Sequence, residues 1–263
     1  NSADLYVMTY PGGPARALSH NSSPTVERNF WEIMPDWSPD GTALLYASDR
    51  GRVRTGTLDL AAWRLTLSNG TRVQISSANA YTGGIDRPRW RPRGGDDLLF
   101  TSWTYDPNTL EPYGQLTVLD LRTRRLETLT APNETGMQAS WSPDGAHVVF
   151  VKRESGRDDI WVLPVSETQA SRAAGNGPPG ETPVASPGPE APPAGAGWRV
   201  VAGMNAQPAW SPDGRALAYI ALVDGSFDLF VQLLDADLRA EGPPRQLTHG
   251  WRLDGASSVA WGR

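Results

Sequence analysis

A tryptophan motif recurs along the chain and restricts its fold more than any other feature. The string Asp-Trp-Ser-Pro-Asp-Gly at 36–41 returns with one change at 140–145 and at 209–214. Weaker copies surround two further tryptophans. The five tryptophans lie at positions 37, 90, 141, 210 and 261, and are therefore spaced by 53, 51, 69 and 51 residues. A period of about 20 to 50 residues is typical of solenoids and propellers, in which one supersecondary unit is repeated.

Each repeat predicts four short β-strands. In Ser-Pro-Asp-Gly the proline fixes φ, the aspartate accepts local backbone hydrogen bonds and the glycine adopts a left-handed conformation, as a tight turn requires. Apolar runs follow the turns, and they place the second strand of each repeat at 43–48, 98–103, 147–153 and 216–223. No helical period is present. Four antiparallel strands per repeat predict an all-β propeller, with the repeated tryptophans as buried anchors between blades.

The third repeat is longer than the others because it contains a proline- and glycine-rich stretch at 174–197. Such a composition forms neither helix nor central strand. A linker between two domains has a similar composition, but the repeat resumes in phase at Trp198–Val201. We therefore predict one β-propeller domain spanning residues 1–263, with an insertion at 174–197 inside a blade.

Composition excludes several classes of function. The net charge is -5 and there is no block of Lys or Arg, whereas a nucleic-acid partner requires a basic face. The longest apolar stretch, Ala216–Val223, is far shorter than the roughly 20 residues of a membrane helix, so we expect no membrane span. Cysteine is absent, which excludes disulfides, thiolate metal sites and cysteine nucleophiles.

Three features make these repeats similar to the WD-like repeats of the TolB family. They are the Pro-x-Trp-Ser-Pro-Asp-Gly start, the apolar second strand ending near 48–50, and third strands such as Asp159–Val162 and Asp4–Met8. The resemblance covers almost the whole chain. It implies an extracytoplasmic protein, periplasmic or secreted, that binds a protein or peptide partner without catalysis. Similar repeats occur in prolyl oligopeptidase-type enzymes. The propeller domain of a larger enzyme, or a carbohydrate-binding or lyase propeller, is therefore the alternative.

The sequence leaves the number of blades open. The chain begins with strands three and four of a repeat and ends with strand one, so joining the ends gives a fifth blade without its second strand. The five visible repeats thus predict either five blades with an imperfect seam or, as in the TolB family, six. The second repeat also departs from the motif, with Arg91-Pro92-Arg93-Gly94 at the turn.

Catalytic and metal-binding signatures are missing from the sequence. It contains no Gly-x-Ser-x-Gly elbow, no His-Glu-x-x-His and no phosphate-binding glycine loop, so we expect no catalytic residues and no cofactor. The acidic groups around Asp235 and Asp106 lack the full calcium-loop pattern and are interpreted as solvated loops, without a metal. Asp4, Asp159 and Asp228 open third strands at one repeated position, which predicts backbone hydrogen bonding.

Blade topology brings the candidate binding residues to one face. In an up-and-down blade, the loops between blades and the loops joining strands two and three emerge together at one mouth of the central channel. Aromatic residues gathered there predict an interaction surface, and polar residues beside the channel would orient the ligand. The predicted aromatic contacts are Trp31, Tyr81, Trp103, Tyr105 and Trp251, and the predicted polar contacts are Glu32, Arg87, Gln138, Asn205 and Gln207.

Overall fold

The computed structural model describes residues 2–9, 11–25, 29–51, 59–76, 84–93, 96–106, 108–131, 134–165, 197–256 and 258–261. Their regular structure is entirely β, as the sequence predicts, and these ranges contain no helix. No helix in the described part is therefore long and apolar enough to cross a membrane. Most of the predicted insertion, and the site candidate Tyr81, lie outside the described residues.

Four antiparallel sheets of four strands each form successive blades. The first blade contains β3 (Glu32–Trp37), β4 (Ala43–Ser48), β5 (Ala61–Thr66) and β6 (Arg72–Gln74). The second contains β7 (Ile85–Trp90), β8 (Asp97–Tyr105), β9 (Pro112–Asp120) and β10 (Leu126–Thr128). The third contains β11 (Thr135–Trp141), β12 (His147–Glu154), β13 (Arg157–Pro164) and β14 (Trp198–Val201). The fourth contains β15 (Asn205–Trp210), β16 (Ala216–Val223), β17 (Ser226–Leu233) and β18 (Arg245–Gln246).

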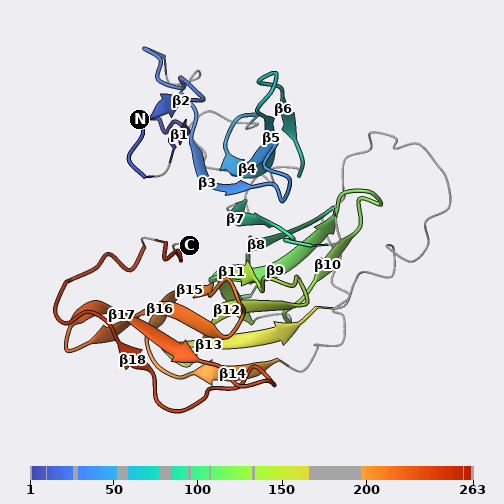
Figure 1. Ribbon diagram of the computed structural model, residues 1–263. Helices are drawn as coiled ribbons and strands as arrows, with labels where there is room; N and C mark the ends of the chain where they lie inside the picture. Colours follow the sequence, from blue (N-terminus) through green and yellow to red (C-terminus); the bar gives the residue numbers. More distant parts are fainter. Residues whose placement is uncertain are drawn as a thin grey trace.

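The ends of the chain do not form a further complete blade within the described residues. β1 (Tyr6–Val7) and β2 (Arg16–Ala17) pair as a separate two-stranded sheet, and the repeat around Trp261 is not a strand. Four of the five repeats are thus complete blades. Figure 1 shows these blades in sequence order, with the red C-terminal segment turning back between the first and fourth blades.

The repeated turn has the predicted geometry in the first, third and fourth blades. In the first blade the Gly41 amide donates to the Ser38 carbonyl at 2.9 Å, and Gly41 has φ 69°. The Ser38 hydroxyl donates to Asp40 at 2.6 Å and accepts from the Ala43 amide at 2.9 Å. The repeated serines are therefore turn formers.

An arginine replaces the turn serine in the second blade. Arg91 is buried and pairs with buried Asp97 at 2.8 Å between Nη1 and Oδ2. Its Nε donates to the Gly145 carbonyl of the third blade at 2.9 Å, and its guanidinium lies 4.9 Å from the centroid of the Trp141 ring. The departure from the motif thus creates a polar bond between two blades.

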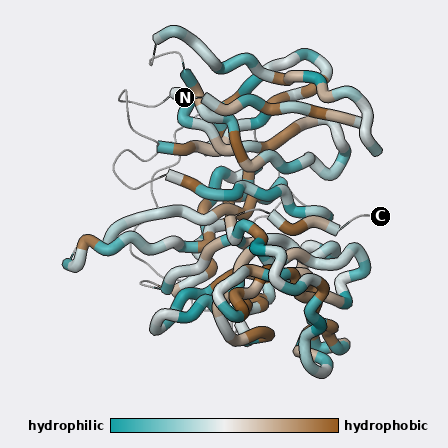
Figure 2. Tube along the Cα trace, turned by 90° about the vertical axis from the view of Figure 1, so that its left-hand side faces the viewer, coloured by the Kyte–Doolittle hydropathy of each residue, from teal (hydrophilic) through white to brown (hydrophobic). Residues whose placement is uncertain are grey.

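Three of the repeated tryptophans, Trp90, Trp141 and Trp210, pack on the blade before their own. Trp141 joins a cluster with Leu99 and Leu116 of the second blade, and Trp210 joins one with Val149 and Ile160 of the third. Their exposed fractions are 6% and 8%, which confirms them as buried anchors. Figure 2 shows the hydrophobic stretches running along the stacked strands.

The prediction of a buried anchor is wrong for Trp37 and Trp261. Trp37 is 50% exposed and Trp261 is 37% exposed. Among the described residues, the blade before the first is represented only by β1 and β2, whose neighbour Leu5 packs on Leu44 and Tyr46. Trp37 therefore lacks the inner strands that cover its counterparts.

The repeated aspartates bind backbone amides, as predicted. Asp4 Oδ1 accepts from the Asn21 amide at 2.6 Å, and Asp159 Oδ1 accepts from the Gly203 amide at 2.8 Å. Asp228 accepts from the amides of Gly250 at 2.9 Å and Trp251 at 3.2 Å. Each of these carboxylates fixes the path of the chain as it leaves the fourth strand of its blade.

Candidate functional site

The innermost strands of the four blades face one central channel. A cavity of about 500 Å³ is lined by residues of β3, β7, β11 and β15, together with 258–261 near the C-terminus. Because the strands come from four separate blades, their facing side chains meet here although they are far apart in the sequence.

Each innermost strand contains one non-glycine residue in the left-handed region. These bulge residues are Met34, Arg87, Gln138 and Gln207, with φ values of 56°, 49°, 55° and 59°. Each lies three residues before the repeated tryptophan and within a register shift of the strand. A β-bulge redirects the side chain, and a non-glycine residue in this region costs about 1–3 kcal/mol, as is common at functional sites.

Bulge residues of adjacent blades are hydrogen-bonded to each other. The Arg87 amide donates to the sulfur of Met34 at 3.4 Å, and the Gln207 amide donates to Oε1 of Gln138 at 2.8 Å. The strained backbone is therefore held by contacts between blades, and three of the bulge residues, Arg87, Gln138 and Gln207, line the cavity.

The half of the channel formed by the first and second blades is charged. Asp36 accepts from the Trp90 amide at 2.8 Å and lies 3.4 Å from Arg89 Nη1. Asp86 lies 3.9 Å from Arg87 Nε. Burial raises the pKa of Asp36, although Arg89 partly offsets it, and burial likewise raises the pKa of Asp86. Burial lowers the pKa of Arg87. These charges are incompletely solvated, which favours a ligand that offers polar partners.

Neutral polar groups line the other half of the channel. Gln138, Ser140 and Gln207 come from the third and fourth blades. The Gln207 side chain donates to the Gly255 carbonyl at 3.1 Å, so the amide of this buried residue points to the C-terminal segment. Three of the predicted polar contacts, Arg87, Gln138 and Gln207, are therefore brought together at the cavity.

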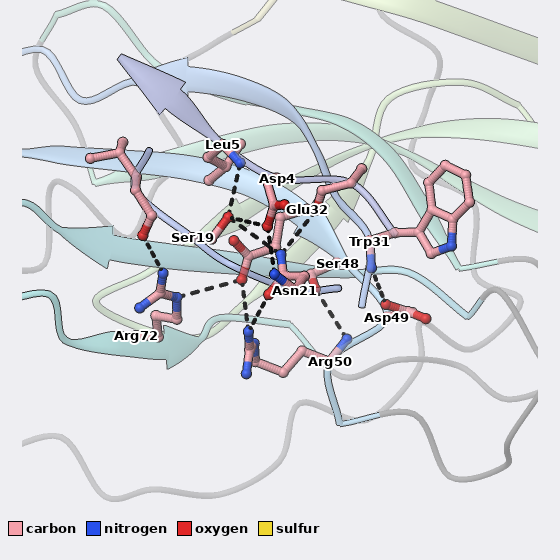
Figure 3. A network of polar contacts seen from close by, with 12 residues as sticks. Asp4, Leu5, Ser19, Asn21, Trp31, Glu32, Ser48, Asp49, Arg50 and Arg72 are labelled. Carbon is pink, nitrogen blue, oxygen red and sulfur yellow. Dashed lines mark hydrogen bonds and ion pairs between the residues drawn. The ribbon is translucent and has the colours of Figure 1, made fainter. Parts of the chain in front are cut away.

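Glu32 is held in an ion-pair network rather than in the cavity lining. The carboxylate is 1% exposed, and its Oε1 lies 3.1 Å from Arg50 Nη2 and 3.4 Å from Arg72 Nε. Arg50 also donates to Asn21 at 2.9 Å, and Asn21 leads to Asp4. Figure 3 shows that this network joins the N-terminal segment to the first blade. Glu32 thus positions the N-terminal sheet.

Asn205 also supports contacts within the fold. It is buried, and its Nδ2 donates to the Asp158 carbonyl at 3.0 Å. Both Glu32 and Asn205 lie five residues before a repeated tryptophan, whereas the bulge residues lie three before it. This difference of two positions separates the predicted residues that face the cavity from those that join blades.

The four predicted aromatic contacts that the structure describes lie outside the lining of the cavity. Trp251 is 70% exposed, and Tyr105, at the end of β8, is also exposed. Trp31 and Trp103 are half-buried, with the Trp31 amide bound to Asp49 at 2.7 Å. Trp251 lies four residues before Gly255, whose carbonyl accepts from the Gln207 side chain. Their binding role stays a prediction.

Four further residues of the innermost strands were not predicted from the sequence. They are Met34 and Asp36 of β3, and Asp86 and Arg89 of β7, of which Asp36 and Arg89 line the cavity. The repeat contained a signal for the first of these, because Met34 occupies the position of Gln138 and Gln207 when the tryptophans are aligned. Phe227, which contacts the C-terminal segment, has no comparable repeated signal.

The described residues offer little to a metal ion. No group of three His, Asp or Glu side chains among them is arranged to hold a metal ion. Asp106 Oδ1 accepts from the Asn108 and Thr109 amides, and Asp235 Oδ1 accepts from the Asp237 and Arg239 amides. Both carboxylates therefore stabilise turns, and the channel is equipped for hydrogen bonding and ion pairing.

Comparison with known proteins relates this arrangement to TolB. No protein-family profile matches the chain. The Tol-Pal system protein TolB of Alcanivorax borkumensis is 28% identical over 123 residues, which are 46% of this chain and 22% of that protein. The crystal structure of TolB from Acinetobacter baumannii superposes with a TM-score of 0.60 at 20% identity, over 93% of this chain and 48% of that one. A putative TolB from Agrobacterium tumefaciens gives 0.56 at 16% identity, over 90% and 66%.

Enzyme structures share the fold as well. A prolyl endopeptidase superposes with a TM-score of 0.54 at 14% identity, over 92% of this chain and 32% of that chain. Oligogalacturonate lyase from Vibrio parahaemolyticus gives 0.55 at 11% identity, over 94% and 60%. At these identities the likeness shows the fold alone. The chain is thus similar to TolB in sequence and structure, and it spans less than half of the TolB chains from Alcanivorax and Acinetobacter.

Proposed function

We propose that this TolB-like β-propeller binds a protein or peptide partner at the mouth of its central channel and carries out no catalysis. The observation that most supports this binding function is the set of bulge residues. Arg87, Gln138 and Gln207 present polar side chains to one cavity from strained, repeat-equivalent positions. Strain at such positions is a mark of functional sites, and Trp251 is an exposed aromatic residue four positions before Gly255, which Gln207 contacts.

A polypeptide suits this channel because the lining combines donors, acceptors and both signs of charge. Arg87 and Gln207 donate hydrogen bonds, whereas Asp36 accepts them. Main-chain amides and carbonyls alternate in the same way. Aromatic side chains at the rim would add contact area at a low entropic cost, in the usual division between anchoring and orienting residues.

The proposal includes the location and the closure of the propeller. Similarity to TolB supports an extracytoplasmic protein, periplasmic or secreted. The two-stranded sheet β1–β2 and the strand-one sequence around Trp261 support a ring with at least one blade beyond the four complete ones. We therefore propose that the complete propeller has five or six blades.

The test is a selection of random peptides on the protein, followed by affinity measurements on the selected sequences. Trp251→Ala, Trp31→Ala and Trp103→Ala remove rim aromatics, and Arg87→Met removes a lining charge while keeping length. We expect at least two of these variants to weaken binding tenfold or more, or about 1.4 kcal/mol each. The matched control is Leu233→Ala, at an exposed position where β17 ends on the opposite face.

The outcomes separate the proposed function from its alternatives. Peptides whose affinity survives every rim and lining change, but falls in Leu233→Ala, would contradict the choice of face. The likeness to oligogalacturonate lyase favours a carbohydrate ligand as the second candidate. A parallel glycan array, with binding to acidic oligosaccharides but to no peptide, would support that candidate instead.

A further inference from the structure

The C-terminal segment places main-chain carbonyls in the channel mouth. The Gln207 side chain of the fourth blade donates to the Gly255 carbonyl at 3.1 Å, and Arg87 Nη2 of the second blade donates to the Ala256 carbonyl at 3.3 Å. The Leu253 amide donates to the Phe227 carbonyl at 3.0 Å. Two bulge residues on separate blades thus bind consecutive carbonyls of one peptide.

Phe227 makes the site selective for a residue without a side chain. A Cβ added at Gly255 would lie 3.0–3.3 Å from three carbons of the Phe227 ring, which is tighter than ordinary packing. The segment is further shaped by Asp254, whose Oδ1 accepts from the Ala256 amide at 2.9 Å. The sequence Asp-Gly-Ala therefore fits the site through its turn, its glycine and its carbonyls.

We propose that residues 252–256 are an internal occupant of the peptide-binding site and that a partner peptide must displace them. The proposal rests on the proposed function, because it uses the same channel mouth. It also defines the ligand class: a peptide that offers two consecutive main-chain carbonyls, the first from a glycine over Phe227. Such a ligand and residues 252–256 need the same groups on Gln207 and Arg87, so they exclude each other.

Competition of this kind lowers the apparent affinity in a calculable way. The apparent dissociation constant is the intrinsic one divided by the fraction of molecules with an open site. If the segment occupies the mouth in nine molecules of ten, its release strengthens partner binding about tenfold. This gain is the quantity to measure.

The experiment displaces the segment in the full chain with Gly255→Val. Valine at this position meets the Phe227 ring, whereas Ala256→Val, the matched control, adds bulk at an exposed neighbour. The probe is the capped peptide Trp-Arg-Leu-Asp-Gly-Ala, which has the sequence of residues 251–256. Its affinity is measured by calorimetry, and hydrogen exchange of the Leu253 amide reports whether the segment has left the mouth.

We expect Gly255→Val to bind the probe about tenfold more tightly than the parent, with faster exchange at Leu253. Ala256→Val should match the parent, and a probe with valine in place of glycine should bind neither protein. Asp254→Ala, which removes an exposed turn acceptor, should give a smaller gain in the same direction. Asp254→Ala therefore still tests the proposal if Gly255→Val does not fold.

Three results would overturn the proposal, and they differ in reach. Equal probe affinity in the parent, Gly255→Val and Asp254→Ala would refute the internal occupant while leaving the channel mouth as a peptide site. If the probe binds no form although selected peptides bind at the mouth, only the internal occupant fails. If neither the probe nor any selected peptide binds, the proposed function fails with it.

Discussion

The packing of the repeated tryptophans predicts an unequal response to one substitution made at three equivalent positions. Trp141 and Trp210 fill the space between complete blades, whereas half of Trp37 is exposed. We expect Trp141→Ala and Trp210→Ala each to lower the free energy of unfolding by about 3–5 kcal/mol. Trp37→Ala should lower it by about half as much.

The magnitude follows from the area that each ring buries. An aromatic side chain buries roughly 150–250 Å², and about 25 cal/mol per Å² gives an upper limit of about 4–6 kcal/mol. The 6% and 8% exposed fractions of Trp141 and Trp210 leave this limit almost unchanged. The 50% exposure of Trp37 halves it, because only part of that ring leaves water on folding.

Urea denaturation of the three purified variants measures these differences, provided that the m-values stay equal to that of the parent. Near-equal losses at all three positions would refute the reasoning, because they would mean that Trp37 is covered as well as its counterparts. A loss below 1 kcal/mol for Trp141→Ala would refute the anchor role itself.

Three further predictions concern other parts of the fold. Arg91→Met should lower the free energy of unfolding by about 3–5 kcal/mol because it leaves buried Asp97 without its cation. The double variant Arg91→Met with Asp97→Leu should recover part of this loss in the same urea assay. Asp86→Asn should gain stability over the parent as the pH rises above about 4. The raised pKa of Asp86 means that the native state keeps the carboxyl proton to a higher pH than the unfolded state, so ionisation of Asp86 lowers the stability of the parent as the pH rises. Thermal melts in which the stability gain of Asp86→Asn is the same at pH 3 and pH 7 would contradict this. Deleting residues 177–195 should leave the melting temperature within a few degrees of the parent, because a proline- and glycine-rich surface insertion makes few packed contacts; a variant that fails to fold would show otherwise.

The sequence by itself determined the fold class, because repetition magnifies weak local signals. One Ser-Pro-Asp-Gly turn is ambiguous, but three copies at equivalent positions predicted the β3–β4, β11–β12 and β15–β16 connections. All four predicted second strands coincide with observed strands, although β8 extends two residues further to Tyr105. Asp159 and Asp228 were interpreted correctly for the same reason.

Only the tertiary structure decided what each repeated position contacts. Trp37 and Trp141 have the same local sequence, yet one is exposed, because burial depends on whether the preceding blade supplies inner strands. Arg87 and Glu32 both looked like channel residues, but a β-bulge directs one to the cavity while Arg50 and Arg72 enclose the other. The contact of Gly255 with Gln207 and Phe227 joins residues up to 48 positions apart, and no local pattern encodes it. Such contacts arise from how the blades are arranged in space, which periodicity alone does not specify.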